Sequence, residues 1–422
     1  MKEKFYNDLE GLLKIPSVTK AGEGEYPFGK DCADALDYAL ALCDSFGFRT
    51  KKSENNMVGY AEIGEGEEMI GILAHLDVVP AGSDWDYPAY GLTREVVDGE
   101  ERLIGRGVVD DKGPAMICIY AMKALLDSGM PITKRVRIIF GTTEETGEWV
   151  DMKFYCETEE LPTFGFTPDA HFPVGYAEKG ISVFELKMPL SLAGIDSVSG
   201  GNAHNMVPDY CECTVNGKKY EAHGLSVHGS TPSLGKNAIV AVMNEINEVS
   251  PCALSDFIVK RIGTACDGSG LGISSWDTES GALTLNLGVI EVRGDEVVMT
   301  IDIRYPVTKS YDDMVAILEA NCGQYGVTVT PVEHKLPVYI EEDGKLITTL
   351  TDVFNIVTGL DAKPFSMGGG TYARAMPNIV SFGPIMPGAS ETAHQKNEYI
   401  TAKDVDTAFR IYAQTLLHLM DI

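Results

Sequence analysis

One stretch of this chain, residues 71–80, limits its fold and its chemistry more than any other. Its apolar residues predict a buried strand, and the strand ends in a His-x-Asp pair, His75 and Asp77. Residues i and i+2 of a strand share a face. We therefore expect His75 to bind a metal ion while Asp77 orients its imidazole. A histidine at a strand end more often has a structural role, so this interpretation needs support from elsewhere in the chain.

Other strand-like stretches also end in side chains that can bind metals. A glycine-flanked turn at residues 105–114, an apolar strand at 137–147, a short strand at 163–169 and a segment at 390–395 supply Asp110, Asp111, Glu144, Glu145, Asp169 and His394. In an open α/β sheet, the C-terminal ends of the strands converge on one crevice. We therefore expect these residues and His75 to form one site.

The number and kind of these ligands indicate the chemistry of the site. Two imidazoles with three or more carboxylates suit two zinc ions per chain, since calcium and magnesium favour oxygen ligands alone. Mn²⁺ and Co²⁺ suit the same ligands. With five ligands for two ions, one carboxylate must bridge, and ions about 3.5–4 Å apart activate a shared water for hydrolysis. An adjacent acid that binds no metal is then the general base.

Composition argues against several other classes of function. The chain has 422 residues, which favours two domains, and a formal net charge of −28. Such a chain offers no basic surface for nucleic acid or for an anionic membrane. Its apolar runs are too short to cross a bilayer, and its N-terminus lacks a secretory segment, so we expect a cytoplasmic protein. Its nine scattered cysteines fit reduced thiols.

The order of the predicted elements indicates the architecture. Helical patterns at residues 2–14, 30–46 and 111–128 alternate with strands at 69–79 and 134–141, which predicts an α/β catalytic domain with a mainly parallel sheet and helices on both faces. A β-rich block at residues 181–335, which has no candidate metal ligands, follows. It predicts an inserted α+β lid. The expected domains are residues 1–180 (catalytic, first part), 181–335 (lid) and 336–422 (catalytic, second part).

The motifs together resemble a known family. They lie at residues 74–77, 105–114, 144–145, 169, 205–209, 228–238, 304–306 and 368–374. This chain is similar to the dinuclear-zinc metallopeptidases that include aminoacylase and glutamate carboxypeptidase, and most similar to their Xaa-His dipeptidase, or carnosinase-like, branch. The resemblance runs nearly from end to end and implies a zinc-peptidase fold with a lid.

The resemblance also implies a role for each candidate residue. Asp110 would bridge two ions. His75 and Asp169 would complete the ligands of one ion, and Glu145 and His394 would complete those of the other. Asp77 would orient His75. Glu144 would be the general base, and the peptide bond between Asp110 and Asp111 would be cis.

For the lid, the resemblance implies that His228 stabilises the oxyanion and that Arg304 binds the terminal carboxylate of the substrate. A planar guanidinium suits that carboxylate. Asn205, Gly369, Gly370 and Thr371 match further substrate-binding positions. The resemblance implies a lid of two sections that encloses the site within one chain. The first section is abbreviated here, but the second, which contains Arg304, is complete, so we expect a monomer; a homodimer is the alternative.

The expected activity is hydrolysis of dipeptides or short peptides. The alternative within enzymes is removal of the acyl group from N-acyl amino acids such as succinyl-diaminopimelate, which needs the same chemistry. A peptide-binding protein that keeps the fold is the alternative outside enzymes. The complete set of ligands and acids favours an active enzyme.

Overall fold

The computed structural model describes residues 2–22 and 24–422, and the chain forms two compact units. The first comprises Met1–Tyr176, Ile340–Phe365 and Thr371–Ile422, and the second comprises Ala177–Tyr339 and Ser366–Gly370. The expected lid, residues 181–335, lies within the second unit. Its sequence-based limits omit four residues at each end and also omit Ser366–Gly370, which the sequence assigned to the catalytic domain.

The first unit is built around a mixed sheet. Its strands lie in the order β1 (Arg49–Lys52), β2 (Gly59–Ile63), β6 (Arg135–Gly141), β3 (Met69–His75), β7 (Phe164–Thr167), β21 (Ile379–Ser381), β9 (Gly175–Glu178) and β19 (Val338–Tyr339), with β20 (Phe365–Met367) also paired to β9. The central strands β6, β3, β7 and β21 are parallel, as expected. The strands towards both edges are antiparallel, so the sheet is mixed.

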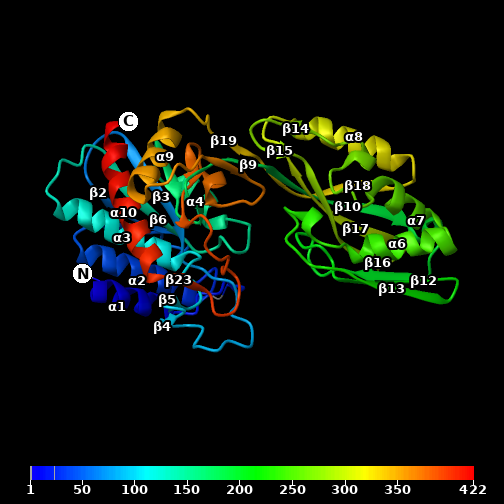
Figure 1. The fold of residues 1–422 in the computed structure, drawn as a ribbon, viewed down its shortest axis with the longest axis horizontal. Helices are drawn as coiled ribbons and strands as arrows, with labels where there is room; N and C mark the ends of the chain where they lie inside the picture. Colours follow the sequence, from blue (N-terminus) through cyan, green and yellow to red (C-terminus); the bar gives the residue numbers. More distant parts are fainter. Residues whose placement is uncertain (1, 23) are drawn as a thin grey trace. The chain divides into compact units, whose positions relative to one another are not determined.

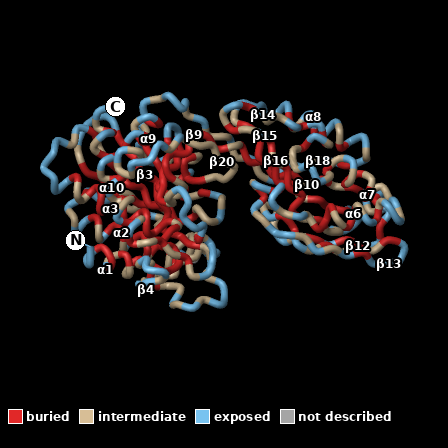
Figure 2. Tube along the Cα trace, in the orientation of Figure 1, coloured by how far each residue is buried: buried red, intermediate tan, exposed pale blue. Residues whose placement is uncertain are grey.

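Helices cover this sheet. They are α1 (Lys2–Leu13), α2 (Lys30–Ser45), α3 (Lys112–Asp127), α4 (Val150–Thr158), α9 (Lys345–Thr358) and α10 (Ala402–His418). All seven residues of β3 are buried, which is typical of a strand with helices on both faces. Figure 2 shows the buried core running through β3 and α3. From α10, Tyr412 stacks on Phe166 of β7.

Two smaller sheets extend the first unit. The strands β4 (Thr93–Val97), β5 (Glu100–Ile104) and β23 (Tyr399–Thr401) form an antiparallel sheet in which β5 is central. The strands β8 (Ala170–His171) and β22 (Pro384–Ile385) form a parallel pair. Both join C-terminal segments of the chain to segments that surround the predicted site.

The second unit has an antiparallel sheet with helices packed on it, the α+β architecture expected for the lid (Figure 1). The strand order is β13 (Lys218–His223), β12 (Tyr210–Val215), β11 (Ser197–Gly200), β16 (Thr284–Arg293), β17 (Glu296–Tyr305), β10 (Gly180–Pro189) and β18 (Thr328–Lys335). The helices are α5 (Leu190–Ala193), α6 (Ala238–Val249), α7 (Ala253–Phe257) and α8 (Tyr311–Gly323), and β14 (Trp276–Asp277) pairs with β15 (Gly281–Ala282). Alternate residues of the strands, such as Phe184 and Leu186, form its core with α6.

One local prediction was wrong. Strand β3 ends at His75, so Asp77 lies beyond the strand and does not share a strand face with His75. The N–H of Leu76 makes the last bond of the ladder, to the carbonyl of Gly141, and the chain then leaves the ladder because the N–H of Val78 donates to the carbonyl of Ser17. Asp77 reaches His75 by a different route, described below.

Candidate metal centre

Two groups of potential metal ligands lie in the first unit. One consists of His75, Asp110 and Asp169, and the other of Asp110, Glu145 and His394. The parallel ladder explains why they meet: His75 ends β3, Glu145 follows β6 and Asp169 follows β7, and parallel strands end at the same edge of a sheet. All five residues expected as ligands therefore lie together.

Asp110 belongs to both groups and presents a different oxygen to each. Its Oδ1 lies 2.9 Å from Nε2 of His75, and its Oδ2 lies 2.9 Å from Nε2 of His394. Asp169 Oδ2 is 3.6 Å from the same nitrogen of His75, and Glu145 Oε2 is 3.0 Å from that of His394. This is the arrangement that a carboxylate bridging two ions requires. The Asp110–Asp111 peptide bond is cis, which confirms that expectation.

The donor atoms fit divalent cations. Nε2 of His75 is buried, and in the neutral ring with its hydrogen on Nδ1 it can only accept, whereas among the described residues it faces the carboxylates of Asp110 and Asp169, which have no hydrogen to donate. A buried polar atom without a partner is costly and calls for an explanation. A cation among these carboxylates would supply the missing partner, and the mixture of nitrogen and oxygen donors suits zinc.

Asp77 lies between His75 and the segment that carries the two glutamates. Its backbone carbonyl is 3.0 Å from Nδ1 of His75, and its carboxylate Oδ1 is 3.5 Å from the same nitrogen. Because a carbonyl can only accept, Nδ1 carries a hydrogen, and in the neutral ring Nε2 is the nitrogen left to bind a metal. The Asp77 carboxylate also accepts the backbone N–H groups of Glu144 and Glu145, at 3.2 and 3.0 Å.

Without a cation, the imidazoles and carboxylates of the site shift one another's pKa values. The neighbouring Asp110 and Glu145 raise the pKa of His394 to about 11. Burial would lower the pKa of His75, but Asp110, Asp169 and Asp77 raise it well above its ordinary value. Burial would raise the pKa of Asp110, but His394 and His75 hold it far below its ordinary value. The positive imidazoles therefore offset part of the negative charge of the site.

The two glutamates also titrate unusually. Burial, together with the charges of Asp169, Glu145 and Asp110, raises the pKa of Glu144 well above its ordinary value, although His75 opposes the shift. Burial and Asp110 raise the pKa of Glu145 to about 7. Among the described residues, Glu145 belongs to one of the two donor groups and Glu144 to neither.

Three further residues, which were not among the predicted ones, support the site. Asp151 is buried and accepts the N–H groups of Thr142 and Thr143 and the hydroxyl of Tyr372, at 2.5, 3.0 and 2.6 Å. Glu398, also buried, binds the turn that carries Asp110. Tyr372 lies within the matched motif 368–374, which could have identified it. Glu398 and Asp151 have no such signal, since a lone acid in a sequence usually indicates solvent exposure.

In the second unit, the segments of Asn205 and His228 lie side by side. The N–H of Gly229 donates to the carbonyl of Asn205 at 2.6 Å, and Met206 and His228 form a β-bridge. Nδ1 of His228 accepts the N–H of Ser230 at 3.2 Å and lies 2.7 Å from its hydroxyl. Because Nδ1 accepts, the hydrogen of the neutral ring is on Nε2, which makes Nε2 a donor.

Arg304 lies on β17 and is buried. Its Nη1 donates to the carbonyl of Gly368 at 3.1 Å, so the segment that includes Gly369 and Gly370 is tied to it. Thr371 belongs to the first unit, where its hydroxyl accepts the N–H of Ala373. The matched glycines and Thr371 are therefore divided between the two units.

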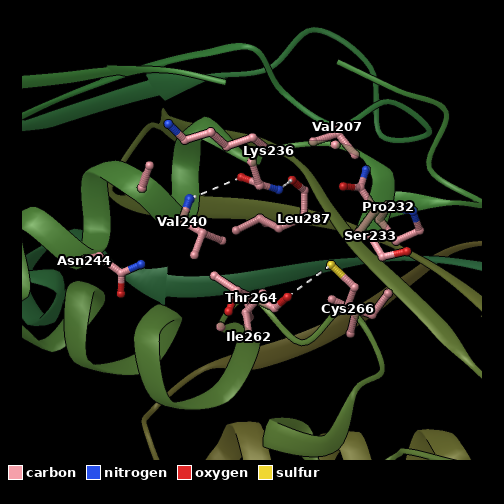
Figure 3. Close-up of a pocket in the computed structure, with 16 residues that line it drawn as sticks. Val207, Pro232, Ser233, Lys236, Val240, Asn244, Ile262, Thr264, Cys266 and Leu287 are labelled. Atoms are coloured by element: carbon pink, nitrogen blue, oxygen red, sulfur yellow. Dashed lines mark hydrogen bonds between the residues drawn. The ribbon is translucent and has the colours of Figure 1, made fainter. Parts of the chain in front are cut away.

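A separate cavity of about 320 Å³ lies within the second unit (Figure 3). It lies between the first turns of α6, strand β16 and the segment from Ile262 to Cys266, and Figure 3 shows Val240 and Leu287 on its wall. Its lining includes no carboxylate and no imidazole. The candidate metal centre is therefore the donor cluster of the first unit and not this cavity.

Among the described residues, no helix has both the length and the apolar character needed to cross a membrane.

Comparison with known proteins agrees with this fold. The family description Peptidase family M20/M25/M40 matches residues 71–418. This chain therefore belongs to that family of peptidases, which confirms the resemblance found in the sequence.

Three known proteins illustrate the similarity. A Bacillus subtilis (strain 168) protein named "Putative dipeptidase YtjP" is 34% identical, over 99% of this chain and 97% of its own length. The structure of human carnosine dipeptidase 1 covers 100% of this chain and 97% of its own, with TM-score 0.64 and 15% identity. That of the Bacillus subtilis YXEP protein, a "Dinuclear Metal Binding Peptidase from M20 Family", covers 99% of both chains, with TM-score 0.57 and 12% identity.

Proposed function

We propose that this protein is a dipeptidase that needs two divalent metal ions, zinc being the best match to its ligands. The observation that carries the proposal is the position of Asp110, whose two oxygens face His75 and His394 at 2.9 Å each. The family membership supports peptide hydrolysis, and the names of the relatives support dipeptides as the substrate class. Bound ions would polarise the scissile carbonyl and make a water molecule more acidic.

We assign the proton transfers to Glu144. It takes a proton from the attacking water and delivers it to the leaving nitrogen, which a carboxylate within reach of both groups can do. Burial and neighbouring carboxylates raise the pKa of Glu144, so it holds a proton more readily than an exposed glutamate. Asp77 positions this base, because its carboxylate accepts the backbone N–H of Glu144.

We assign substrate binding to residues of the lid and to Thr371 of the first unit. His228 would donate from Nε2 to the oxyanion of the tetrahedral intermediate, an interaction that is strongest in the transition state. Arg304 would bind the terminal carboxylate of the peptide. Three of its five N–H groups contact Asp302 and Gly368, and one N–H on each Nη atom remains for that carboxylate. Asn205, Gly369, Gly370 and Thr371 complete the proposed substrate site.

One panel of substrates tests this proposal. Purified protein is assayed against dipeptides and against N-acyl amino acids, then again after metal chelation and after zinc is restored. We expect dipeptide hydrolysis that chelation abolishes and zinc restores. Preferential hydrolysis of the N-acyl amino acids would instead identify a deacylase. Turnover that survives complete removal of metal, or no turnover of either class with zinc bound, would refute the proposal.

A further inference from the structure

Glu398, which belongs to neither group of potential ligands, contacts the turn that carries Asp110 at several points. The backbone N–H groups of Gly107, Val109 and Asp110 donate to its Oε1 at 3.1, 2.8 and 3.2 Å. Its other oxygen, Oε2, lies 2.5 Å from Nη1 of Arg106 in a buried ion pair. A carboxylate that accepts several backbone N–H groups fixes the conformation of the backbone that donates them.

The register of the small sheet places Glu398 at this turn. Strand β23 pairs with β5 so that Tyr399 lies opposite Ile104, and the N–H of Gly105 then donates to the carbonyl of Glu398 at 3.0 Å. The side chain of Glu398 therefore begins where β5 ends and the Asp110 turn starts. Its position follows from the pairing of the strands.

Glu398 is also close to His394 in the chain, and the segment between them is held in a loop. The hydroxyl of Thr392 donates to the carbonyl of Tyr399 at 2.8 Å, and the N–H of Tyr399 approaches the same hydroxyl at 3.2 Å. The loop that presents His394 thus closes next to Glu398. Glu398 therefore contacts the turn that carries Asp110 and also lies at the base of the loop that carries His394.

We infer that Glu398 is a positioning residue that holds Asp110 and His394 in register and thereby sets the affinity of the ion shared by Asp110, Glu145 and His394. This inference rests on the proposed function. Displacement of Glu398 alters the positions of two of the three ligands in that group. In the group of His75, Asp110 and Asp169, the same displacement alters the position of Asp110 alone.

The test uses Glu398→Asp, which keeps the charge but retracts the carboxylate by one methylene. Zinc is titrated into the metal-free protein against a chromophoric chelator, without substrate. We expect the zinc equivalent that His394→Ala also weakens to lose about 10–100-fold in affinity, and the other to change less than about threefold, the scale expected on altering a residue that supports metal ligands. Glu398→Gln keeps the reach and one acceptor oxygen, so its loss should be smaller than that of Glu398→Asp.

Glu62→Asp is the matched control. Glu62 is a buried carboxylate of the same unit that binds Arg137 at 2.6 Å, and it contacts neither group of ligands. We expect this variant to lower the thermal stability of the metal-free protein without changing either zinc affinity. If Glu398→Asp also lowers the thermal stability without changing either zinc affinity, Glu398 has only a structural role and the inference fails.

Two other results would also overturn the inference. Equal losses for both zinc equivalents would show that Glu398 does not act on one group selectively, and a larger loss in Glu398→Gln than in Glu398→Asp would show that charge, not position, matters. If Glu398→Asp does not fold, the selective loss in Glu398→Gln decides the question. If the unaltered protein itself fails to bind two zinc ions, the proposed function fails instead.

Discussion

Asp302 and Arg304, two residues apart on β17, form a buried ion pair through two hydrogen bonds. Nε of Arg304 donates to Oδ1 of Asp302 at 2.7 Å, and Nη2 donates to Oδ2 at 2.6 Å. Alternate residues of a strand share a face, so the two side chains can lie in one plane. Burial would raise the pKa of Asp302, but His204 and Arg304 lower it, and the carboxylate stays ionised. Asp302 therefore fixes the orientation of the guanidinium.

Replacing Asp302 tests the proposed contact between Arg304 and the substrate. Asp302→Asn keeps the shape of the side chain but leaves Arg304 buried without a countercharge, which should cost about 3–5 kcal/mol of unfolding free energy. We expect KM for dipeptides to rise about 10-fold or more, with a smaller change in kcat, because the guanidinium loses its fixed orientation. Steady-state kinetics and chemical unfolding measure the two effects.

The control for this variant is Glu185→Gln. Glu185, on the neighbouring strand β10 of the same unit, pairs with Arg293 of β16, but the arginine of that pair is exposed. Exposed ion pairs contribute little, so neither stability nor KM should change much. An unchanged KM in a folded Asp302→Asn protein would show that the orientation of Arg304 does not matter for substrate binding.

Glu144→Gln tests the general base. The amide keeps the size of the side chain but cannot take a proton, so we expect kcat to fall at least about 10²-fold while zinc content stays the same. The control is Glu148→Gln, an exposed residue of the same segment, which should retain normal turnover. Near-normal turnover of Glu144→Gln would remove Glu144 from the mechanism.

Sequence patterns predicted which candidate residues lie together in the structure, because strand ends and ligand types are local features. His75, Glu145 and Asp169 each follow a short apolar strand, and the parallel order of the central strands brings them together. Asp110 and His394 were also candidates from their motifs, but which ion each would bind came from the family resemblance, because turns and loops leave no periodic pattern. The same limitation explains why Asp77 was placed on a strand that in fact ends at His75.

The supporting residues could not be predicted from the sequence for a physical reason. Glu398 and Asp302 act through contacts with backbone or with one arginine, and nothing in the sequence distinguishes them from exposed acids. Their burial depends on the pairing of β23 with β5 and of β17 with its neighbours, which is a property of the whole fold. The antiparallel edge strands of the large sheet were not predicted either, since strands such as β1 are short and mostly exposed.

Zinc binding should release protons. In the metal-free protein Asp110 and Glu145 raise the pKa of His394 to about 11, and neighbouring carboxylates also raise the pKa of His75, so both imidazoles hold a proton more firmly than exposed histidines do. Both must lose a proton to bind metal, so we expect release of about one proton per histidine. Zinc affinity should therefore fall as the pH falls, because protons compete with the ions.

Calorimetric titrations in buffers with different ionisation enthalpies measure this release. His223→Ala, which alters a histidine of the second unit outside both donor groups, is the control and should release as many protons as the unaltered protein. His394→Ala should release about one proton fewer. Zinc binding without proton release at pH 7 would contradict the assignment of the histidines as ligands.

His228→Ala tests the lid histidine and the oligomeric state together. Loss of one oxyanion donor should lower kcat about 10²–10³-fold and leave zinc content unchanged, since His228 belongs to neither donor group. His223→Ala again serves as the control and should retain activity. In a monomer, each chain supplies its own His228, so mixing Glu144→Gln protein with His228→Ala protein should restore no activity. Recovery of activity on mixing would show that a partner subunit supplies the histidine, and the expectation of a monomer would be wrong.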